Sequence, residues 1–296
     1  MKNSKIWHLG CLMLASVFAA CSSDVVTEVE TGFAELHFSV SPYEKIPMDA
    51  DTRSVAAKDA LKYLSIAFFK DGQLVDEQIT QTYGGETDTE FGTFAKTLPY
   101  GTYQLVVIGV GKNGSGAATI NSPQNITFAN NEVTETYSSY QTLTVTKDSE
   151  KSLAVSLTHT VARFKMITSD KSPSTISTLS FRVVGGGVAL NATTGTAVES
   201  AEQTKTFNVA SLAGKVFSQI NIYSFLTTTA ETTATITVTA KDADENILME
   251  RTFTDVPLQI GYSTTYRGNL FSNESTWSVT VDSSAFTEMT ETPTIF

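Results

Sequence analysis

Cys21, which closes the first hydrophobic stretch of the chain, is the residue whose surroundings indicate a specific chemistry. Lys2 and Lys5 give the chain a positive start, and an almost wholly apolar core of residues 6–20 follows. That core is too short to span a bilayer, for which about 20 apolar residues are needed. A positive start, a short apolar core and small residues before a cleavage point are typical of a secretory signal peptide. We therefore predict that residues 1–20 are removed.

The residues before Cys21 also predict the fate of its thiol. Phe18-Ala19-Ala20-Cys21 resembles a lipobox, in which the cysteine becomes the lipidated first residue of the mature chain, although Phe is an unusual occupant of the first position. The alternative is a cysteine that lies by chance inside a plain secretory signal. Cys11, the other cysteine, falls within the removed peptide. The mature chain would then have no disulfide, so its core alone must hold the fold in an oxidising compartment.

The charge balance argues against two classes of partner. The chain carries 20 basic and 31 acidic side chains, a formal charge of −11, and loss of the two signal lysines leaves 18 basic side chains and a charge of −13. So acidic a surface disfavours nucleic acid and anionic lipid as partners. Residues 21–32 are polar and acidic, and we expect them to form an extended tether.

Two short runs mimic ligand-binding motifs without completing them. The glycine run 109–114 has the spacing of a dinucleotide-binding loop, but no helical sequence follows it, so we interpret it as a glycine-rich hairpin. Residues 242–246 begin like a calcium loop. Such a loop needs Gly where this chain has Ile247 and Glu where it has Phe253. We interpret residues 241–246 as the turn of a hairpin.

Histidine and nucleophilic side chains indicate no catalytic site. His8 leaves with the signal, whereas His37 and His159 lie far apart without the spacing of metal ligands, and we interpret both as structural. The sequence contains no Gly-x-Ser-x-Gly elbow, no activated cysteine and no close acid pair. We therefore predict that the protein is not an enzyme and has no catalytic residue, metal or cofactor, with its aromatic residues in the core.

The strongest periodicity past the tether is two residues, the repeat of a strand with one buried face. Thr and Ser fill most of the outward positions, which suits a pleated, half-exposed surface. The alternating runs are 34–40, 143–146, 153–157, 162–166, 234–240 and 277–281.

Turn signals separate these runs, and helical signal is sparse. Asp71-Gly72 favours the positive φ of a tight hairpin, and similar Gly and Asn pairs recur along the chain. Residues 54–64 allow about two helical turns and residues 209–212 a shorter one. We predict a mainly β protein in which antiparallel sheets pack as two tandem β-sandwiches of transthyretin-like, Greek-key type.

A polar turn at residues 147–151 marks the most natural division of the chain. We predict a signal peptide at 1–20, the acidic tether at 21–32, an N-terminal β-sandwich domain at 33–157 and a C-terminal one at 158–296.

Four further segments carry a resemblance to a known family. In order, they are Thr52-Arg53-Ser54, the run LPYGTY at 98–103, LTHTVARF at 157–164 and YSTTYRGNLF at 262–271. Behind a lipoprotein signal and on a β-sandwich chain, they resemble the fimbrillin family, the subunits of type V pili on Bacteroides-type bacteria. Together they span nearly the whole mature sequence.

The resemblance implies assembly by strand exchange. Family pilins reach the surface as lipoproteins, and a trypsin-like protease cuts after an arginine in an early loop, discarding the lipid and the first strand. A C-terminal segment of another subunit then fills the groove by strand addition. Here the matching bond lies between Arg53 and Ser54, the removable strand is Phe33–Val40, and the donor lies within Trp277–Phe296. An ordinary surface arginine is the alternative for Arg53.

The resemblance also implies where the protein acts and with what. Expected partners are other fimbrial subunits and the outer membrane, reached through a palmitate-type lipid on Cys21, with the protein exposed on the cell surface in a fimbrium. Two other functions remain open. One is an uncut, lipid-anchored anchor subunit or a tip subunit of the same fibre. The other is a surface lipoprotein that binds glycan.

Overall fold

The computed structural model describes residues 31–44, 53–54, 57–85, 88–272 and 277–282. Within these ranges the chain forms 21 strands, one single-turn α-helix and two 3₁₀ turns, so the predicted mainly β class is confirmed. All of these elements belong to one compact unit that begins at Gly32.

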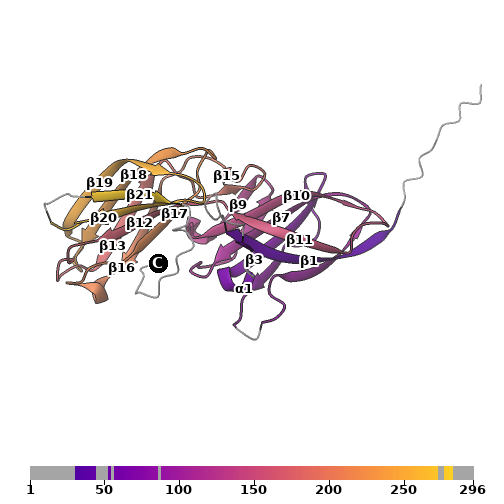
Figure 1. Ribbon diagram of the computed structural model, residues 1–296, viewed down its shortest axis with the longest axis horizontal. Helices are drawn as coiled ribbons and strands as arrows, with labels where there is room; N and C mark the ends of the chain where they lie inside the picture. Colours follow the sequence, from indigo (N-terminus) through magenta and orange to yellow (C-terminus); the bar gives the residue numbers. More distant parts are fainter. Residues whose placement is uncertain (1–30, 45–52, 55–56, 86–87, 273–276, 283–296) are drawn as a thin grey trace, which may run out of the picture. The chain divides into compact units, whose positions relative to one another are not determined.

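Figure 1 labels the elements where there is room. Those up to residue 159 are β1 (Phe33–Glu44), β2 (Arg53–Ser54), α1 (Ala57–Ala60), β3 (Leu61–Lys70), β4 (Gln73–Leu74), β5 (Ile79–Thr82), β6 (Thr93–Pro99), β7 (Gly101–Gly111), β8 (Thr119–Ser122), β9 (Asn125–Thr127), η1 (Ala129–Asn131), β10 (Thr136–Val145) and β11 (Ser152–His159). Those that follow are β12 (Ala162–Thr168), β13 (Thr178–Val184), β14 (Leu190–Asn191), β15 (Thr196–Ala197), β16 (Gln203–Asn208), η2 (Ala210–Leu212), β17 (Ile220–Ser224), β18 (Thr232–Lys241), β19 (Ile247–Leu258), β20 (Ser263–Gly268) and β21 (Trp277–Asp282).

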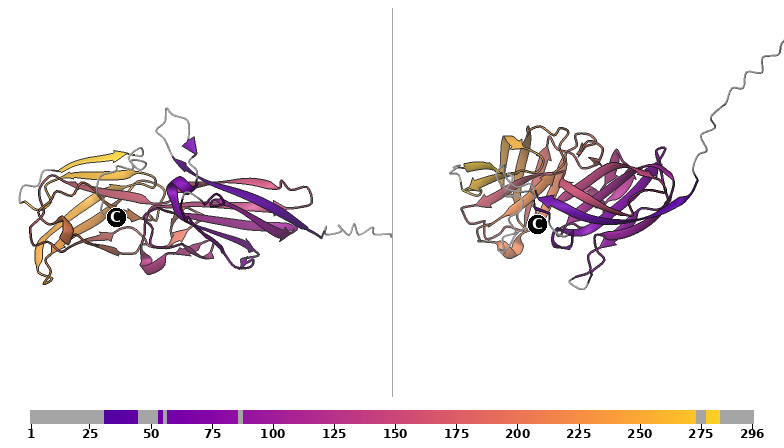
Figure 2. Two further views of the ribbon diagram at one scale, coloured as in Figure 1. Left: turned by 90° about the horizontal axis from the view of Figure 1, so that it is seen from below. Right: turned by 45° about the vertical axis from the view of Figure 1, so that its right-hand side comes forward.

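A nine-stranded sheet contains most of the strands that precede residue 160. Its strands pair in the order β2-β1-β11-β10-β7-β3-β4, with β6 also beside β1 and β5 beside β3. β10 and β11 share only two residue pairs, Tyr137 with His159 and Ser138 with Thr158. The sheet folds over at this narrow contact, so the strands of its two ends bury a common core. In Figures 1 and 2 the long indigo strand β1 and its neighbour β11 run across β3, β7 and β10.

Most of the strands that follow residue 160 form two four-stranded sheets around a second core. Their orders are β17-β12-β20-β21 and β16-β13-β18-β19. Alternate residues of each sheet, such as Phe164 and Met166 of β12 and Ile236 and Val238 of β18, are fully buried between them. In β18 the buried residues alternate with partly exposed ones, as period-two alternation predicts for a strand with one wet face. In β12 the predicted outward residues Arg163 and Lys165 are buried as well, so the expectation of one wet face is wrong for residues 162–166.

A third cluster joins residues from both parts of the chain. The small sheet β15-β14-β9-β8 covers the outer face of β3 and β7, and Ile126 and Leu190 pack there with Phe69, Val106 and Phe225. Ile126 of β9 and Leu190 of β14 are also a register pair of this sheet. Strands from the two parts of the chain therefore share backbone hydrogen bonds as well as apolar contacts.

Strand direction departs from the prediction at two pairings. β1 with β11 and β12 with β20 run parallel, whereas antiparallel sheets were expected throughout. Parallel neighbours need a long connection between them, and both pairs have one, because each joins strands far apart in the sequence. Periodicity alone carries no information on strand direction, so this feature was not predictable from the alternation.

The two helical turns predicted for residues 54–64 are mostly wrong. α1 covers only Ala57–Ala60, and Leu61 already begins β3. β3 pairs with β7 on one edge and with β5 on the other, and Leu61 and Leu64 are fully buried in the core of the nine-stranded sheet. Tertiary pairing thus overrides a weak local helical preference. The short turn expected at residues 209–212 is confirmed as η2.

The glycine run 109–114 does not form the predicted hairpin. The chain turns after β7, where the N–H of Gly114 donates to the carbonyl of Gly111 at 2.9 Å, but the next strand, β8, pairs with β9. β7 already has β3 and β10 on its two edges, so no edge is left for β8. The hairpin predicted at residues 241–246 is confirmed, since β18 and β19 pair directly across it.

A single carboxylate holds the chain where it leaves β20. Asp170 accepts the N–H of Leu270 on Oδ1 at 2.8 Å, and on Oδ2 it accepts those of Phe271 and Ser272 at 2.8 and 2.7 Å. These bonds to an ionised acceptor link the end of β12 to a turn a hundred residues later. They fix Leu270 in the core, where it is fully buried.

Replacing this carboxylate tests its contribution to stability. We expect Asp170→Ala to lower the free energy of unfolding by about 3 kcal/mol, because three N–H groups lose a charged acceptor. Urea unfolding followed by tryptophan fluorescence measures the change. Asp148→Ala is the matched control, since the carboxylate of Asp148 has no partner among the described residues, and it should cost less than about 0.5 kcal/mol. Equal effects of the two substitutions would contradict this role for Asp170.

Candidate strand-exchange site

The first strand of the fold is paired on both edges. β1 pairs antiparallel with β6 from Phe33 to Ser39 and parallel with β11 from His37 to Pro42. Its amide at Val40 also donates to the carbonyl of Gly92 at 2.7 Å. β1 is therefore an inserted central strand whose removal would expose two unpaired edges at once.

The inward side chains of β1 form part of the core of the nine-stranded sheet. Leu36, Phe38 and Val40 are between 0 and 4% exposed. The ring of Phe38 stacks on Phe94 of β6 with centroids 4.5 Å apart and planes 5° apart, and it meets the edge of Phe68 of β3 at 5.6 Å. The outward residues of the same strand, such as Glu35 and His37, are exposed. The alternation predicted for residues 34–40 is thus confirmed.

The described part of the link between β1 and α1 is the two-residue strand β2. After Glu44 come residues 45–52, which lie outside the described part of the chain, and then β2. β2 pairs with the end of β1 through only two register pairs, Tyr43 with Ser54 and Glu44 with Arg53. The bond between Arg53 and Ser54, at which cleavage is predicted, therefore lies after the whole of β1. Its hydrolysis would leave β1 held by noncovalent contacts alone.

The predicted donor segment begins as an edge strand. β21 (Trp277–Asp282) pairs antiparallel with β20 and has no strand on its other edge among the described elements. Its side chains after Trp277 are exposed, including the apolar Val279 and Val281 at 45 and 40%. Residues 283–296, the remainder of the predicted donor, lie outside the described residues.

Trp277 is the only side chain of β21 that reaches the core, and its fit there is incomplete. The indole packs at right angles on Phe253 with centroids 5.0 Å apart and lies 6.3 Å from the ring of Tyr266. Its Nε1 is buried and has no hydrogen-bond partner in the described structure. An unpaired buried donor costs about 1–3 kcal/mol, which weakens the attachment of β21.

The predicted lipidation site cannot be compared with the structure, whereas metal ligands and membrane-spanning helices can be examined in the described residues. Cys21, the predicted lipid acceptor, lies with the signal peptide outside the described residues. Within the described ranges, no group of three or more His, Cys, Asp or Glu side chains is arranged to hold a metal ion. The described helices include none that is both long and apolar enough to cross a membrane.

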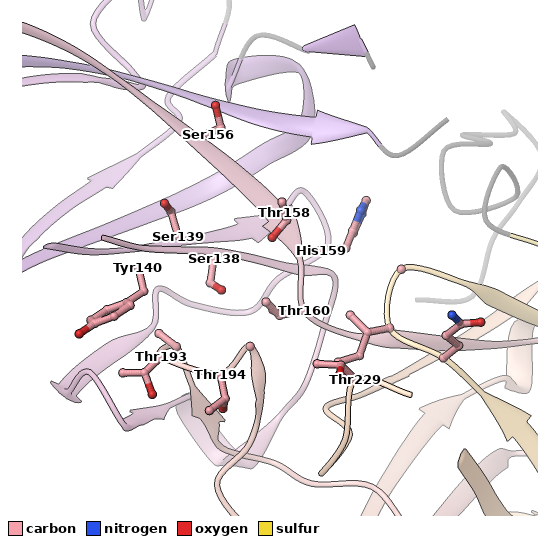
Figure 3. A pocket seen from close by; sticks show the side chains of 15 residues that line it. Ser138, Ser139, Tyr140, Ser156, Thr158, His159, Thr160, Thr193, Thr194 and Thr229 are labelled. Carbon is pink, nitrogen blue, oxygen red and sulfur yellow. The ribbon is translucent and has the colours of Figure 1, made fainter. Parts of the chain in front are cut away.

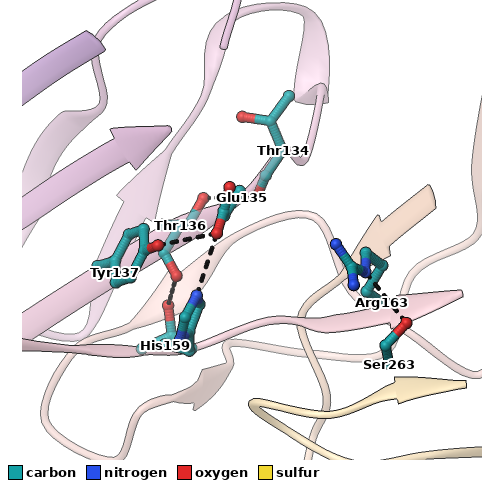
Figure 4. A network of polar contacts seen from close by, with 8 residues as sticks. Thr134, Glu135, Thr136, Tyr137, His159, Arg163 and Ser263 are labelled. Atoms are coloured by element: carbon teal, nitrogen blue, oxygen red, sulfur yellow. Dashed lines mark hydrogen bonds and ion pairs between the residues drawn. The ribbon is translucent and has the colours of Figure 1, made fainter. Parts of the chain in front are cut away.

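A polar network where β10, β11 and β12 meet was missed by the sequence analysis (Figure 4). Glu135 Oε1 accepts the hydroxyl of Tyr137 at 2.8 Å and lies 3.1 Å from Nε2 of His159. Arg163, almost fully buried, donates from Nε to the hydroxyl of Ser263 at 3.1 Å. The interpretation of His159 as structural agrees with this contact. The fold-over of the sheet brings Glu135 next to His159, and the spacing of the two residues in the sequence gives no sign of this contact.

The network holds Glu135 in its ionised form. Burial alone would raise the pKa of this carboxyl, but the hydrogen bond and charge of His159, the hydroxyl of Tyr137 and the charge of Arg163 together lower the pKa below its ordinary value of 4.5. A carboxyl whose pKa is lowered by folding stabilises the folded state at any pH above its unfolded value, and that contribution is lost as the pH falls through the folded value.

Comparison with known proteins adds a family and a fold. The model of a family of unknown function, DUF6562, matches residues 26–295. No curated protein matches the chain.

Several solved structures of bacterial surface proteins resemble this one. A proposed adhesin from Bacteroides thetaiotaomicron has a TM-score of 0.50 at 10% identity, over 86% of this chain and 98% of its own. Proposed polysaccharide-binding proteins from the same species have a TM-score of 0.50 at 9% identity, over 84% and 96%. The fimbrial anchor protein Mfa2 of Porphyromonas gingivalis has a TM-score of 0.43 at 10% identity, over 84% and 97%. At such identities these likenesses show a shared fold alone, and the last value is too low to carry an argument.

The pKa of Glu135 predicts an acid-sensitive component of stability. We expect Glu135→Gln to lower the free energy of unfolding by about 3 kcal/mol near neutral pH, because the ionic contacts of a largely buried carboxylate are lost. Since that contribution is lost as the pH falls below about 4.5, the two proteins should converge in stability at lower pH. Urea unfolding across this pH range measures the difference. Glu77→Gln, at an exposed position, is the control; a gap between wild type and Glu135→Gln that does not depend on pH would contradict the prediction.

Proposed function

The chain belongs to the family of unknown function DUF6562, and we propose that it is a structural subunit of a cell-surface fimbrium that assembles by strand exchange. The observation that carries this proposal is the position of β1. It is a central strand by pairing, yet one hydrolysed bond after Arg53 would separate it covalently from everything that follows.

Loss of β1 would create a site that favours another chain. The inward side chains Leu36, Phe38 and Val40 would leave, and the ring of Phe94 would lose the partner on which it stacks. Each large apolar side chain that returns to such a groove contributes about 1.5–3 kcal/mol. The edges of β6 and β11 would also regain their backbone partners, so an incoming strand with period-two alternation would satisfy both requirements.

The donor that we propose lies within residues 277–296 of a second copy or of a related subunit. β21 has the alternation that the groove requires, with Trp277, Val279 and Val281 on one face. Among the described elements it pairs through one edge only, and the unpaired Nε1 of Trp277 weakens that attachment. A strand of this kind exchanges partners at a low energetic cost.

Two sandwich domains, 33–157 and 158–296, remain our proposal for the domain organisation. The separate cores of the nine-stranded sheet and of the two four-stranded sheets support it. So does a repeated strand order: β1 lies between antiparallel β6 and parallel β11, and β12 lies between antiparallel β17 and parallel β20. The first strand of each proposed domain thus occupies the same topological position.

We also propose that the protein reaches the outer membrane as a lipoprotein through Cys21. If the bond after Arg53 is cut in the cell, the lipid leaves with β1 and the subunit joins the shaft of the fibre. If the bond stays intact, the lipid stays as well, and the protein serves as an anchor.

Controlled cleavage tests the exchange. In the mature protein with Cys21→Ala, we expect mild trypsin to cut after Arg53 and start polymerisation, seen as a ladder on a denaturing gel of unheated samples. Deleting residues 277–296 should leave the cut intact and abolish growth, because the donor is lost. Monomers after complete cleavage, or growth without the C-terminal segment, would contradict the shaft function and favour the anchor.

A disulfide lock provides a sharper control for the same experiment. Glu35 and Thr97 are exposed register partners on β1 and β6, so cysteines at both positions should hold β1 in place after the cut and block growth until a reductant is added. Cysteines at Thr237 and Thr252, a facing pair on β18 and β19 with hydroxyls 3.1 Å apart, are the matched control and should not block growth.

Lipidation has a separate test. Cys21→Ala should give an envelope protein that no longer incorporates labelled palmitate and no longer sediments with membranes, because the acyl chains that hold a lipoprotein on the bilayer are absent. Ser22→Ala is the matched control. Unchanged labelling and membrane retention of Cys21→Ala would exclude a lipid anchor at this residue.

A further inference from the structure

A hollow of about 720 Å³ opens on the outer face of β10 and β11 (Figure 3). Ser138 and Tyr140 of β10 and Ser156 and Thr158 of β11 line one side of it. The turn between β14 and β15, at residues 192–195, lines another. Thr229 and the turn at residues 259–261 complete the wall. A sheet surface and three loops from later in the chain thus enclose one space.

The path of the two strands explains why the hollow exists. β10 and β11 are neighbours only at Tyr137 with His159 and at Ser138 with Thr158. Beyond that contact β10 follows β7 while β11 follows β1, so the strands diverge. The two strands that border the wedge are held in place by β1 and β7.

The lining is polar but almost without charge. Eight of its fifteen residues are Ser or Thr, and none is Asp, Glu, Lys or Arg. The one ionisable side chain apart from Tyr140 is His159, whose Nε2 is engaged by Glu135. A chain of formal charge −11 therefore presents a neutral hollow at this place.

Several of the lining hydroxyls are available to a ligand. Those of Ser138, Ser156, Thr158 and Thr229 have no hydrogen-bond partner among the described residues. The hydroxyl of Tyr140 accepts a hydrogen bond from Nε2 of Gln104 at 3.1 Å, which orients the ring at the edge of the hollow. A Ser or Thr hydroxyl can both donate and accept, so this set can pair with groups that do both.

We propose that this hollow binds a neutral carbohydrate. Sugar hydroxyls are both donors and acceptors, and the C–H face of a sugar ring is apolar enough to rest on the Tyr140 ring. The volume lies within the range of about 300–1,000 Å³ of small-molecule sites. Acidic sugars fit poorly, because no Lys or Arg lines the hollow to pair with a carboxylate. No residue of β1 or β21 lines it, so binding does not rest on strand exchange.

Binding of defined oligosaccharides to the uncut mature protein tests this site. The probes are neutral gluco-, galacto-, manno- and xylo-oligosaccharides, with sialyllactose and oligogalacturonate as acidic comparators, measured by saturation-transfer NMR and titration calorimetry. We expect at least one neutral probe to bind and the acidic comparators to bind more weakly. Absence of binding by every neutral probe, or a preference for the acidic ones, would overturn the proposal.

A pair of matched substitutions locates the binding. Thr158 and Ala154 are both exposed on the outer face of β11, but only Thr158 lines the hollow. Thr158→Trp should fill the space and weaken binding about tenfold or more, whereas Ala154→Trp should leave it unchanged. Thr229→Trp fills the space from the opposite wall and replaces Thr158→Trp if that variant does not fold. Full affinity in the filled variants, or equal loss in Ala154→Trp, would overturn the proposal. Polymerisation after trypsin cleavage is measured in a separate experiment, so loss of carbohydrate binding and loss of strand exchange can be told apart.

Discussion

β1 is hydrogen-bonded along both of its edges, and the core of the nine-stranded sheet is packed around its side chains. β1 pairs antiparallel with β6 and parallel with β11, so it joins these two strands into one sheet. Its Phe38 side chain is buried in the core. Buried backbone N–H and C=O groups must be paired, so the edges of β6 and β11 require a strand between them, whether it comes from the same chain or from another. Under the proposed strand exchange, loss of β1 would turn this fold into an acceptor for a strand of another chain.

The fold-over between β10 and β11 has a second consequence. It brings Glu135 of the loop before β10 to His159 at the end of β11, and the chain then enters β12 with Arg163 buried beside Ser263. Charges so placed are retained only with partners, since an unpaired buried charge is costly. The same divergence of β10 and β11 opens the hollow lined by hydroxyl groups. One topological feature thus gives both a buried polar network and a cavity.

The two proposed activities use different surfaces of the protein. Strand exchange would use the core and edges around β1 and the edge of β21 that no described strand pairs with, whereas the hollow is lined by neither strand. A subunit in a fibre could therefore keep its hollow open while its strand slots are filled. Multiple weak sugar sites along one fibre would bind a surface glycan far more tightly than one site, because the later contacts form at a high effective concentration.

Local sequence patterns were enough to predict the mainly β class, the strands with period-two alternation such as residues 34–40 and 234–240, and the hairpin turns at Asp71 and at residues 241–246. These features are local, because side-chain alternation and positive φ are encoded by neighbouring residues. Such patterns could not determine strand direction, the partners of β7 and β8, the strand at Leu61, the pairing of Glu135 with His159, or the hollow. Those depend on which distant strands meet, and only the tertiary structure decides this, since pairing and burial across the fold outweigh the weak preferences of any single segment.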